Sequence, residues 1–168
     1  MTLHVVPGAN ARCGTERIET GAVLLVHLQD GHNIDSLLAW LILNRFREVE
    51  RIVLHKVVSP DYELPESGVA GMRLLSKLYG AISTSSEQLE EYRQAISKVF
   101  PSIYTLICIE TGDAGEALGR LAKSGAFDRV LLLGEEKKSI WKVFGASLAQ
   151  VLKDVGECPV EVIPAPAS

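Results

Sequence analysis

Residues 22–58 read AVLLVHLQDGHNIDSLLAWLILNRFREVERIVLHKVV, and they place a segment of helical length between two short aliphatic runs. The first run, Ala22–Leu28, ends at a polar turn, which is typical of a strand buried on both faces of a parallel sheet. Residues 34–46 repeat apolar side chains at helical spacing. Residues 51–58 (RIVLHKVV) resemble the first run. This stretch therefore predicts a strand, a helix and a second strand.

The rest of the chain continues this alternation. Further helices are expected over residues 67–79, 83–99, 114–124 and 140–155, and further strands over residues 102–109, 129–133 and 160–163. The segment SSEQLEE at residues 85–91 has the pattern of a helix start, and Asn33 or Asp35 and Asp113 are candidate caps. Strands that alternate with helices imply a parallel sheet covered on both faces. We therefore predict an α/β fold with one doubly wound five-stranded parallel sheet.

Length and composition fit one globular domain. The chain has 168 residues, of which 47% are hydrophobic and 23% charged, so it does not have the composition of a disordered protein. We expect an N-terminal extension over residues 1–20, a domain over residues 21–164 and a tail over residues 165–168. The formal net charge of −4 gives no general reason to bind nucleic acid or an anionic membrane.

Membrane insertion and secretion are not expected. The longest apolar run, from Leu37 to Leu43, is far shorter than the roughly 20 residues of a membrane span. The N-terminal sequence MTLHVVPGANARCG has neither a basic leader nor an apolar segment of signal-peptide length. The expected location is the cytoplasm.

The cysteines and histidines do not form a recognisable motif. Cys13, Cys108 and Cys158 are widely spaced and none lies in a C-x-x-C pair, so the spacing indicates neither a disulfide framework nor a zinc site. His27 and His55 lie inside predicted strands, where a hydrogen-bonded core histidine is the usual explanation. We therefore predict no metal ligands from the spacing.

A small polar cluster follows the first strand. It consists of Asp30, His32 and Asp35, and a metal or acid–base role is conceivable there, although the spacing does not demand one. No G-x-S-x-G, H-E-x-x-H or Cys–His arrangement is present. No catalytic residue is predicted.

The loop after the fourth strand leaves two interpretations open. It reads GEEKKS at residues 134–139 and leads into a predicted helix, a position that favours phosphate binding. However, Gly134 is its only glycine, and Glu135 and Glu136 repel an anion, which Lys137 and Lys138 partly offset. The loop is therefore either a phosphate site or a plain connection between strand and helix.

Several segments resemble the universal stress protein family. The sequence ASLAQVLKDVGECPVEV at residues 146–162 resembles, without a gap, the closing pattern of that family, in which Gly-Ser is followed by an amphipathic helix and Cys-Pro-Val-x-Val. Four earlier segments also resemble segments of that family, and they occur in the family's order. They are LLVHLQDG (24–31), LHKVVSP (54–60, one residue inserted), ETGDAGEAL (110–118) and DRVLLLG (128–134). The similarity spans residues 21–164 and implies an adenine nucleotide alpha hydrolase-like, flavodoxin-like three-layer sandwich.

The resemblance also bears on nucleotide binding. ATP-binding members of the family carry Gly-x-x-Gly and, about nine residues later, Gly-Ser or Gly-Thr, where glycine lets the backbone approach phosphate. Here Lys137 and Ala146 replace the second and third glycines. The resemblance therefore implies that ATP binding is weak or lost. If ATP or AMP does bind, the implied ligands are Asp30, Val57, Val58, Gly134, Lys137 and Ser147.

The resemblance implies a non-enzymatic regulatory module for stress response that acts as a homodimer through the last strand, Val160–Ile163. One alternative is an adenine-nucleotide-binding stress protein. Another is a cytosolic regulatory domain or partner of a larger assembly such as a transporter, bound on the strongly apolar helix from Ser36 to Phe46. A slow phosphohydrolase is disfavoured because no base or metal constellation is visible.

Overall fold

The structure is a computed structural model that describes residues 21–29, 31–44, 49–59, 68–134, 148–155 and 158–163. Strands and helices alternate along these ranges, as predicted. In chain order they are β1 (Ala22–Leu28), α1 (Ile34–Leu43), β2 (Val49–Val58), α2 (Gly68–Val99), β3 (Tyr104–Thr111), α3 (Ala114–Lys123), β4 (Arg129–Leu133), α4 (Leu148–Val155) and β5 (Val160–Ile163). The predicted extension (1–20), residues 140–147 of the predicted last helix, and the tail (165–168) lie outside the described residues.

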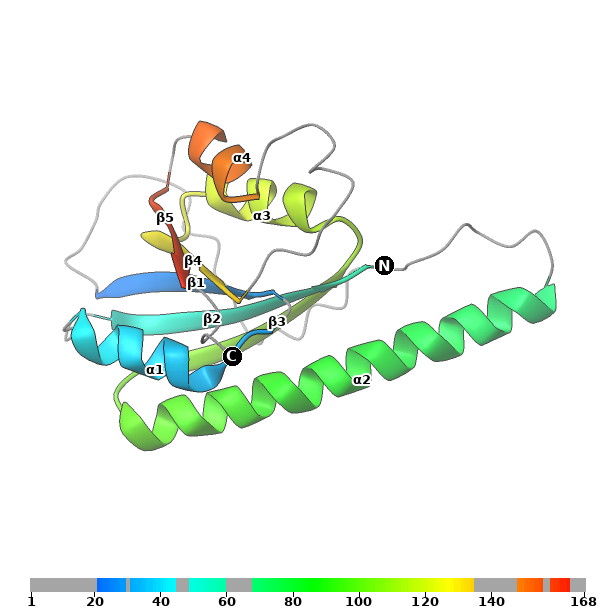
Figure 1. The fold of residues 1–168 in the computed structure, drawn as a ribbon, viewed down its shortest axis with the longest axis horizontal. Coiled ribbons are helices and arrows are strands. Elements are labelled where there is room, and N and C mark those ends of the chain that lie inside the picture. Colours follow the sequence, from blue (N-terminus) through cyan, green and yellow to red (C-terminus); the bar gives the residue numbers. More distant parts are fainter. Residues whose placement is uncertain are drawn as a thin grey trace.

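The strands form one parallel sheet in the order β3-β2-β1-β4-β5. From β1 the chain moves outward to β2 and β3, then returns to the other side of β1 for β4 and β5. Helices α1 and α2 cover one face of the sheet, and α3 and α4 cover the other (Figure 1). The predicted doubly wound fold is therefore confirmed, and its strand order reverses between β1 and β4.

The alternation of side chains along β1 divides the core into two layers. Leu24, Val26 and Leu28 point to the face covered by α1 and α2, whereas Leu25 points to the face covered by α3 and α4. The first layer includes Leu37, Leu41, Leu54, Leu89, Ile96 and Leu131, and the second includes Leu118, Val130, Leu132 and Leu152. Burial on both faces explains why β1 has no polar residue before His27.

Strand β1 is held to β4 at both ends. The carboxylate of Asp128 accepts a hydrogen bond from the backbone N–H of Val23 at 2.8 Å, across 105 positions of sequence. At the other end the backbone N–H of Gln29 donates to the carbonyl of Leu133 at 2.8 Å. These contacts fix the register of two strands that are distant in sequence.

Helix α2 corrects the prediction of two helices over residues 67–79 and 83–99. It is one continuous helix of 32 residues, and it continues through Gly80 and through SSEQLEE, so the predicted helix start there was wrong. A single glycine costs a helix only about 1 kcal/mol relative to alanine, which does not interrupt it. None of the helices in the described ranges is both long and apolar enough to cross a bilayer.

The two halves of α2 have different surroundings. The C-terminal half packs on the sheet through Leu89, Tyr92 and Ile96, which are buried. The N-terminal half extends past the end of the sheet (Figure 1), and Met72 and Tyr79 are exposed there.

The predicted caps of α1 and α3 are confirmed. The Asn33 side chain caps α1 by accepting from the backbone N–H of Asp35 at 2.7 Å. The Asp113 carboxylate caps α3 by accepting from the backbone N–H of Glu116 at 2.8 Å. Both bonds satisfy backbone donors that the first turn of a helix leaves unpaired.

We expect Asp113→Ala to lower the free energy of unfolding by about 1 kcal/mol, because it removes the acceptor for the first turn of α3. Urea unfolding of the wild type and the variant measures this. Asp113→Asn keeps an acceptor and should lose clearly less; equal losses in the two variants would contradict the role of the cap.

Candidate functional site

The carboxyl ends of β1, β2 and β4 are neighbours at one edge of the sheet. In parallel α/β sheets this edge binds ligands, near the point where the strand order reverses. Val57 and Val58 end β2, and Gly134 follows β4 directly. The fold therefore brings three of the six predicted nucleotide-binding residues to one edge. Asp30, Lys137 and Ser147 lie outside the described residues.

Two backbone groups at this edge already have partners. The carbonyl of Val58 accepts from the N–H of Gly112 at 3.2 Å. The N–H of Gly134, which has a φ of 104°, donates to the carbonyl of Ile163 at 3.0 Å. A phosphate that used the Gly134 N–H would therefore have to replace a hydrogen bond between β4 and β5.

The predicted polar cluster after β1 is joined to α2. His32 Nδ1 lies 2.6 Å from the Tyr92 hydroxyl, and the two rings meet edge to face. Burial raises the pKa of Tyr92 to about 12, so its hydroxyl keeps its proton at neutral pH. Asp35 is exposed in the first turn of α1, and Asp30 is outside the described residues. Within the described part of this cluster, His32 links the end of β1 to α2.

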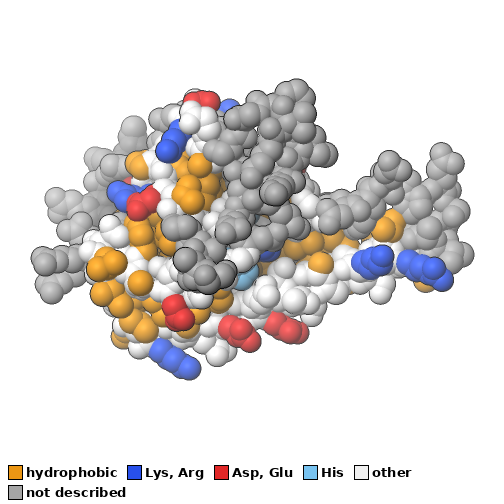
Figure 2. Space-filling model, viewed as in Figure 1, with side chains coloured by type: hydrophobic (Ala, Val, Ile, Leu, Met, Phe, Trp, Pro, Cys, Tyr) orange, Lys and Arg blue, Asp and Glu red, His pale blue; other side chains and the backbone are white. Residues whose placement is uncertain are grey.

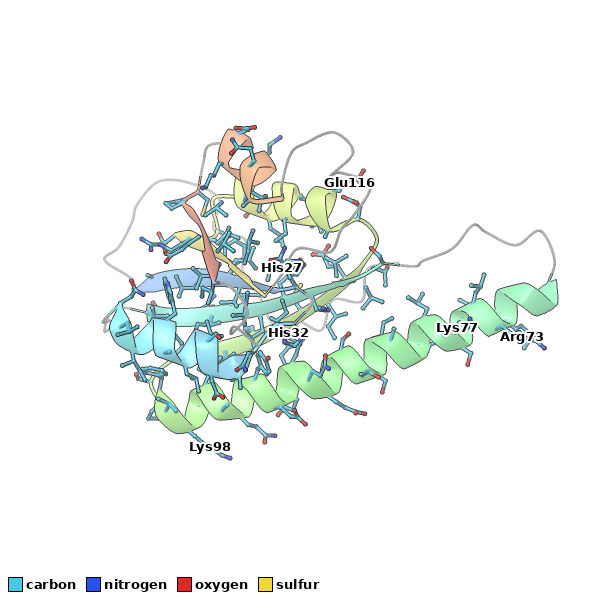
Figure 3. The ribbon with its side chains drawn as sticks, in the orientation of Figure 1. His27, His32, Arg73, Lys77, Lys98 and Glu116 are labelled. Carbon is cyan, nitrogen blue, oxygen red and sulfur yellow. The ribbon has the colours of Figure 1, made fainter. Side chains whose placement is uncertain are left out.

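A second polar group lies under the α3 side of the sheet. His27 on β1, His55 on β2 and Cys108 on β3 occupy one register level across three neighbouring strands. Glu110 is two residues beyond Cys108 and shares its face, and Arg120 reaches Glu110 from α3. Figure 3 labels His27 on the side of the sheet that faces α3. We call these five residues the β-row cluster.

The two histidines of the β-row cluster contact each other through their Nδ1 atoms, which are 3.0 Å apart. Burial, and next the neighbouring His55, hold the pKa of His27 well below its usual value, so His27 is neutral at pH 7. His55 is completely buried. Its Nε2 has no hydrogen-bond partner within the described ranges and lies 3.7 Å from Glu110 Oε1, beyond hydrogen-bonding distance.

Glu110 carries the negative charge of the cluster. Its carboxylate is buried and forms an ion pair through Oε2 with Arg120, whose side chain is 57% exposed. The neighbouring His55, and then Arg120, lower the pKa of Glu110 to about 2, although burial acts in the opposite direction. Cys108 Sγ lies 3.9 Å from Glu110 Oε1. Burial, with the charge of Glu110, raises the pKa of Cys108 to about 11.

The cluster therefore holds a neutral thiol, two imidazoles and a carboxylate. A thiol with a raised pKa is a poor nucleophile, which disfavours covalent catalysis by Cys108. Sequence reasoning placed His27 and His55 correctly as hydrogen-bonded core histidines but missed the cluster. The available signal was the spacing of Cys108 and Glu110, which lie two positions apart on one strand and therefore on one face of the sheet.

The outer edge next to β5 is partly apolar. Trp40 of α1 is buried and donates its indole N–H to Glu161 Oε1 at 2.7 Å, and Arg129 contacts the other oxygen at 3.0 Å. Near these contacts of Trp40 and Glu161, Leu43 is 79% exposed and Val162 of β5 is 48% exposed. Figure 2 shows hydrophobic side chains gathered over α1.

Comparison with known proteins gives structural matches only. No family model matches the sequence, and no curated protein matches it. Universal stress protein UspA from Lactobacillus plantarum matches at 17% identity and a TM-score of 0.62, covering 86% of this chain and 98% of that one. A universal stress protein family member from Burkholderia pseudomallei matches at 19% identity and a TM-score of 0.57, covering 86% and 96%.

A third match is the universal stress protein family protein At3g01520 from Arabidopsis thaliana, solved with AMP bound. It is 16% identical, with a TM-score of 0.51, and the match covers 87% of this chain and 93% of that one. Each match spans nearly the whole of the known structure and 86–87% of this chain. The chain therefore has the universal stress protein fold.

Proposed function

We propose that this chain is a universal stress protein that acts as a non-enzymatic regulatory module of stress response, in the form of a homodimer. Two observations support this proposal. The resembling segments occur in the family's order over residues 21–164. The fold is that of three universal stress proteins.

The position of β5 at one side of the sheet supports the proposed homodimer. Val160–Ile163 is the last strand of the sheet, and its described backbone bonds go to β4. An open strand edge is prone to pair with another chain, and a two-fold axis would pair two copies of β5. The carbonyls of Pro159 and Ile163 accept from β4, so the alternating groups of Val160 and Val162 point to the outer edge.

We expect Val162→Pro to weaken the dimer at least tenfold, because proline removes an outward N–H that the second copy would bond. Sedimentation velocity over a range of concentrations measures the dissociation constant. Val162→Thr keeps the N–H and is the matched control, which should dimerise like the wild type. A wild-type chain that stays monomeric at high micromolar concentration would contradict the homodimer.

A second candidate is binding of ATP or AMP, which the AMP-bound Arabidopsis protein favours. The ligands would be Asp30, Val57, Val58, Gly134, Lys137 and Ser147. We propose that this binding is weak or lost, because Lys137 and Ala146 stand where glycines are expected and the Gly134 N–H is bonded to Ile163. Calorimetry with each nucleotide tests this: micromolar affinity that falls in Ser147→Ala or Lys137→Ala would favour the nucleotide-binding alternative.

The third candidate is a partner within a larger assembly, bound on the helix from Ser36 to Phe46. The exposure of Ile42 and Leu43 at the end of α1 favours it. Leu43→Lys separates this candidate from the homodimer. It changes the α1 surface and should weaken binding of such a partner, but it leaves the backbone edge of β5 intact and should not weaken the homodimer.

A further inference from the structure

We propose that His55, Cys108 and Glu110 form a binding site for one divalent transition-metal ion of the kind that Zn²⁺ represents. Their donor atoms are an imidazole nitrogen, a sulfur and a carboxylate oxygen, which are the three kinds of ligand that Zn²⁺ takes in proteins. Among the described residues these atoms all lie within 4.8 Å of one another. The proposal does not rest on the proposed function, because none of the three residues belongs to the nucleotide or dimer sites.

Two of the three separations between donor atoms are close to those of a tetrahedral site. Zinc bonds of about 2.0 Å to nitrogen and oxygen and about 2.3 Å to sulfur place neighbouring donors roughly 3.3–3.6 Å apart. In the structure Glu110 Oε1 lies 3.7 Å from His55 Nε2 and 3.9 Å from Cys108 Sγ. The two pairs that involve Glu110 would have to close by a few tenths of an ångström, and the pair of His55 and Cys108, which lies within 4.8 Å, by up to about 1.3 Å. Water would be the fourth ligand.

The surroundings of His55 indicate a metal-binding role rather than packing alone. Its side chain is completely buried, and within the described residues Nε2 has no partner at hydrogen-bonding distance, while Glu110 Oε1 lies 3.7 Å away. A buried nitrogen of this kind is uncommon in folded proteins. A metal ion would bind the lone pair that Nε2 has when the proton of His55 is on Nδ1.

His27 offers an acceptor to the tautomer of His55 that metal binding needs. When His55 Nδ1 carries the proton it can donate to Nδ1 of His27 at 3.0 Å, which leaves Nε2 deprotonated. Metal-bound histidines usually donate their second N–H to such a partner.

Arg120 and Cys108 affect the orientation of the Glu110 carboxylate and the charge of the site. Arg120 binds Oε2 of Glu110, which leaves Oε1 on the side of His55 and Cys108. Cys108 is only partly buried. On binding, the thiol releases its proton to water, and the thiolate and the carboxylate offset the charge of a divalent ion, while Arg120 adds one positive charge beside the site.

Cobalt binding to the chelator-treated full chain tests the proposal. Co²⁺ replaces Zn²⁺ and gives a near-ultraviolet charge-transfer band when a thiolate binds it. In a Cys13→Ala/Cys158→Ala chain Cys108 is the single thiol, and we expect one Co²⁺ per chain with this band, displaced by Zn²⁺. Adding Cys108→Ser should remove the band and weaken binding at least tenfold, and Glu110→Gln should also weaken binding. His32→Gln, outside the β-row cluster, should change neither.

Two results would overturn the site: no uptake of Co²⁺ or Zn²⁺ by the chain with Cys108 as its single thiol, or a band and an affinity that survive Cys108→Ser. If a variant does not fold, X-ray absorption of the zinc-loaded wild type decides. One sulfur with nitrogen and oxygen neighbours supports the site, whereas no sulfur or several sulfurs excludes it.

Discussion

The free energy of unfolding is expected to fall as the pH drops below about 6.5, because His27 resists protonation in the folded chain. Burial holds the pKa of His27 well below its usual value of 6.5 in the folded chain. Below about pH 6.5 the unfolded chain therefore binds a proton that the folded chain excludes. The contribution is constant above that pH and is lost as the pH falls, at up to about 1.4 kcal/mol per pH unit.

Urea unfolding at a series of pH values, in the presence of a chelator, measures this slope. In His27→Gln the slope should be shallower by one proton over the same range, whatever the stability of the variant at pH 8. His32→Gln is the matched control and should keep the wild-type slope of unfolding free energy against pH. Parallel curves for the wild type and His27→Gln would show that His27 does not resist protonation in the folded chain.

The Arg120→Met variant is expected to lose about 2 kcal/mol of stability at pH 7. This value lies between the effect of an exposed ion pair, below about 1 kcal/mol, and that of breaking a buried one, about 3–5 kcal/mol. The intermediate value follows from the geometry, because Arg120 is half exposed while Glu110 is buried. Methionine keeps the aliphatic stem and leaves the Glu110 carboxylate without its cationic partner.

The loss should depend on pH in a defined direction. Glu110 has a folded pKa of about 2, below its usual 4.5, so its contribution is present above about pH 4.5 and is lost as the pH falls toward 2. The difference between wild type and Arg120→Met should shrink over that range. Lys123→Met on the same helix is the control, expected within about 0.5 kcal/mol of wild type. A similar loss in Lys123→Met would assign the effect to α3 itself.

Most of the fold could be predicted from local patterns. The aliphatic runs at Ala22–Leu28 and Arg129–Leu133 are buried on both faces, so they stand out from the amphipathic segments between them. The continuity of α2 could not be predicted, because the serines near Ser85 have the pattern of a helix start. In the structure Ser85 is buried within the helix.

The β-row cluster could not be predicted from spacing alone. His27 and His55 are 28 positions apart, and Cys108 is much further along the chain. They meet because β1, β2 and β3 are neighbours in a register that places the three residues at one level. Register depends on the packing of whole strands, which no short motif records.

The central place of β1 also affects the order in which the sheet can close. Pairing β1 with β2 spans 28 positions at the histidines, whereas tying Val23 to Asp128 beside β4 spans 105. The chain entropy lost in closing the longer loop is greater by about 1.2 kcal/mol. The half that holds His27 and His55 is thus favoured to assemble early in folding, and the β1–β4 seam is the later step.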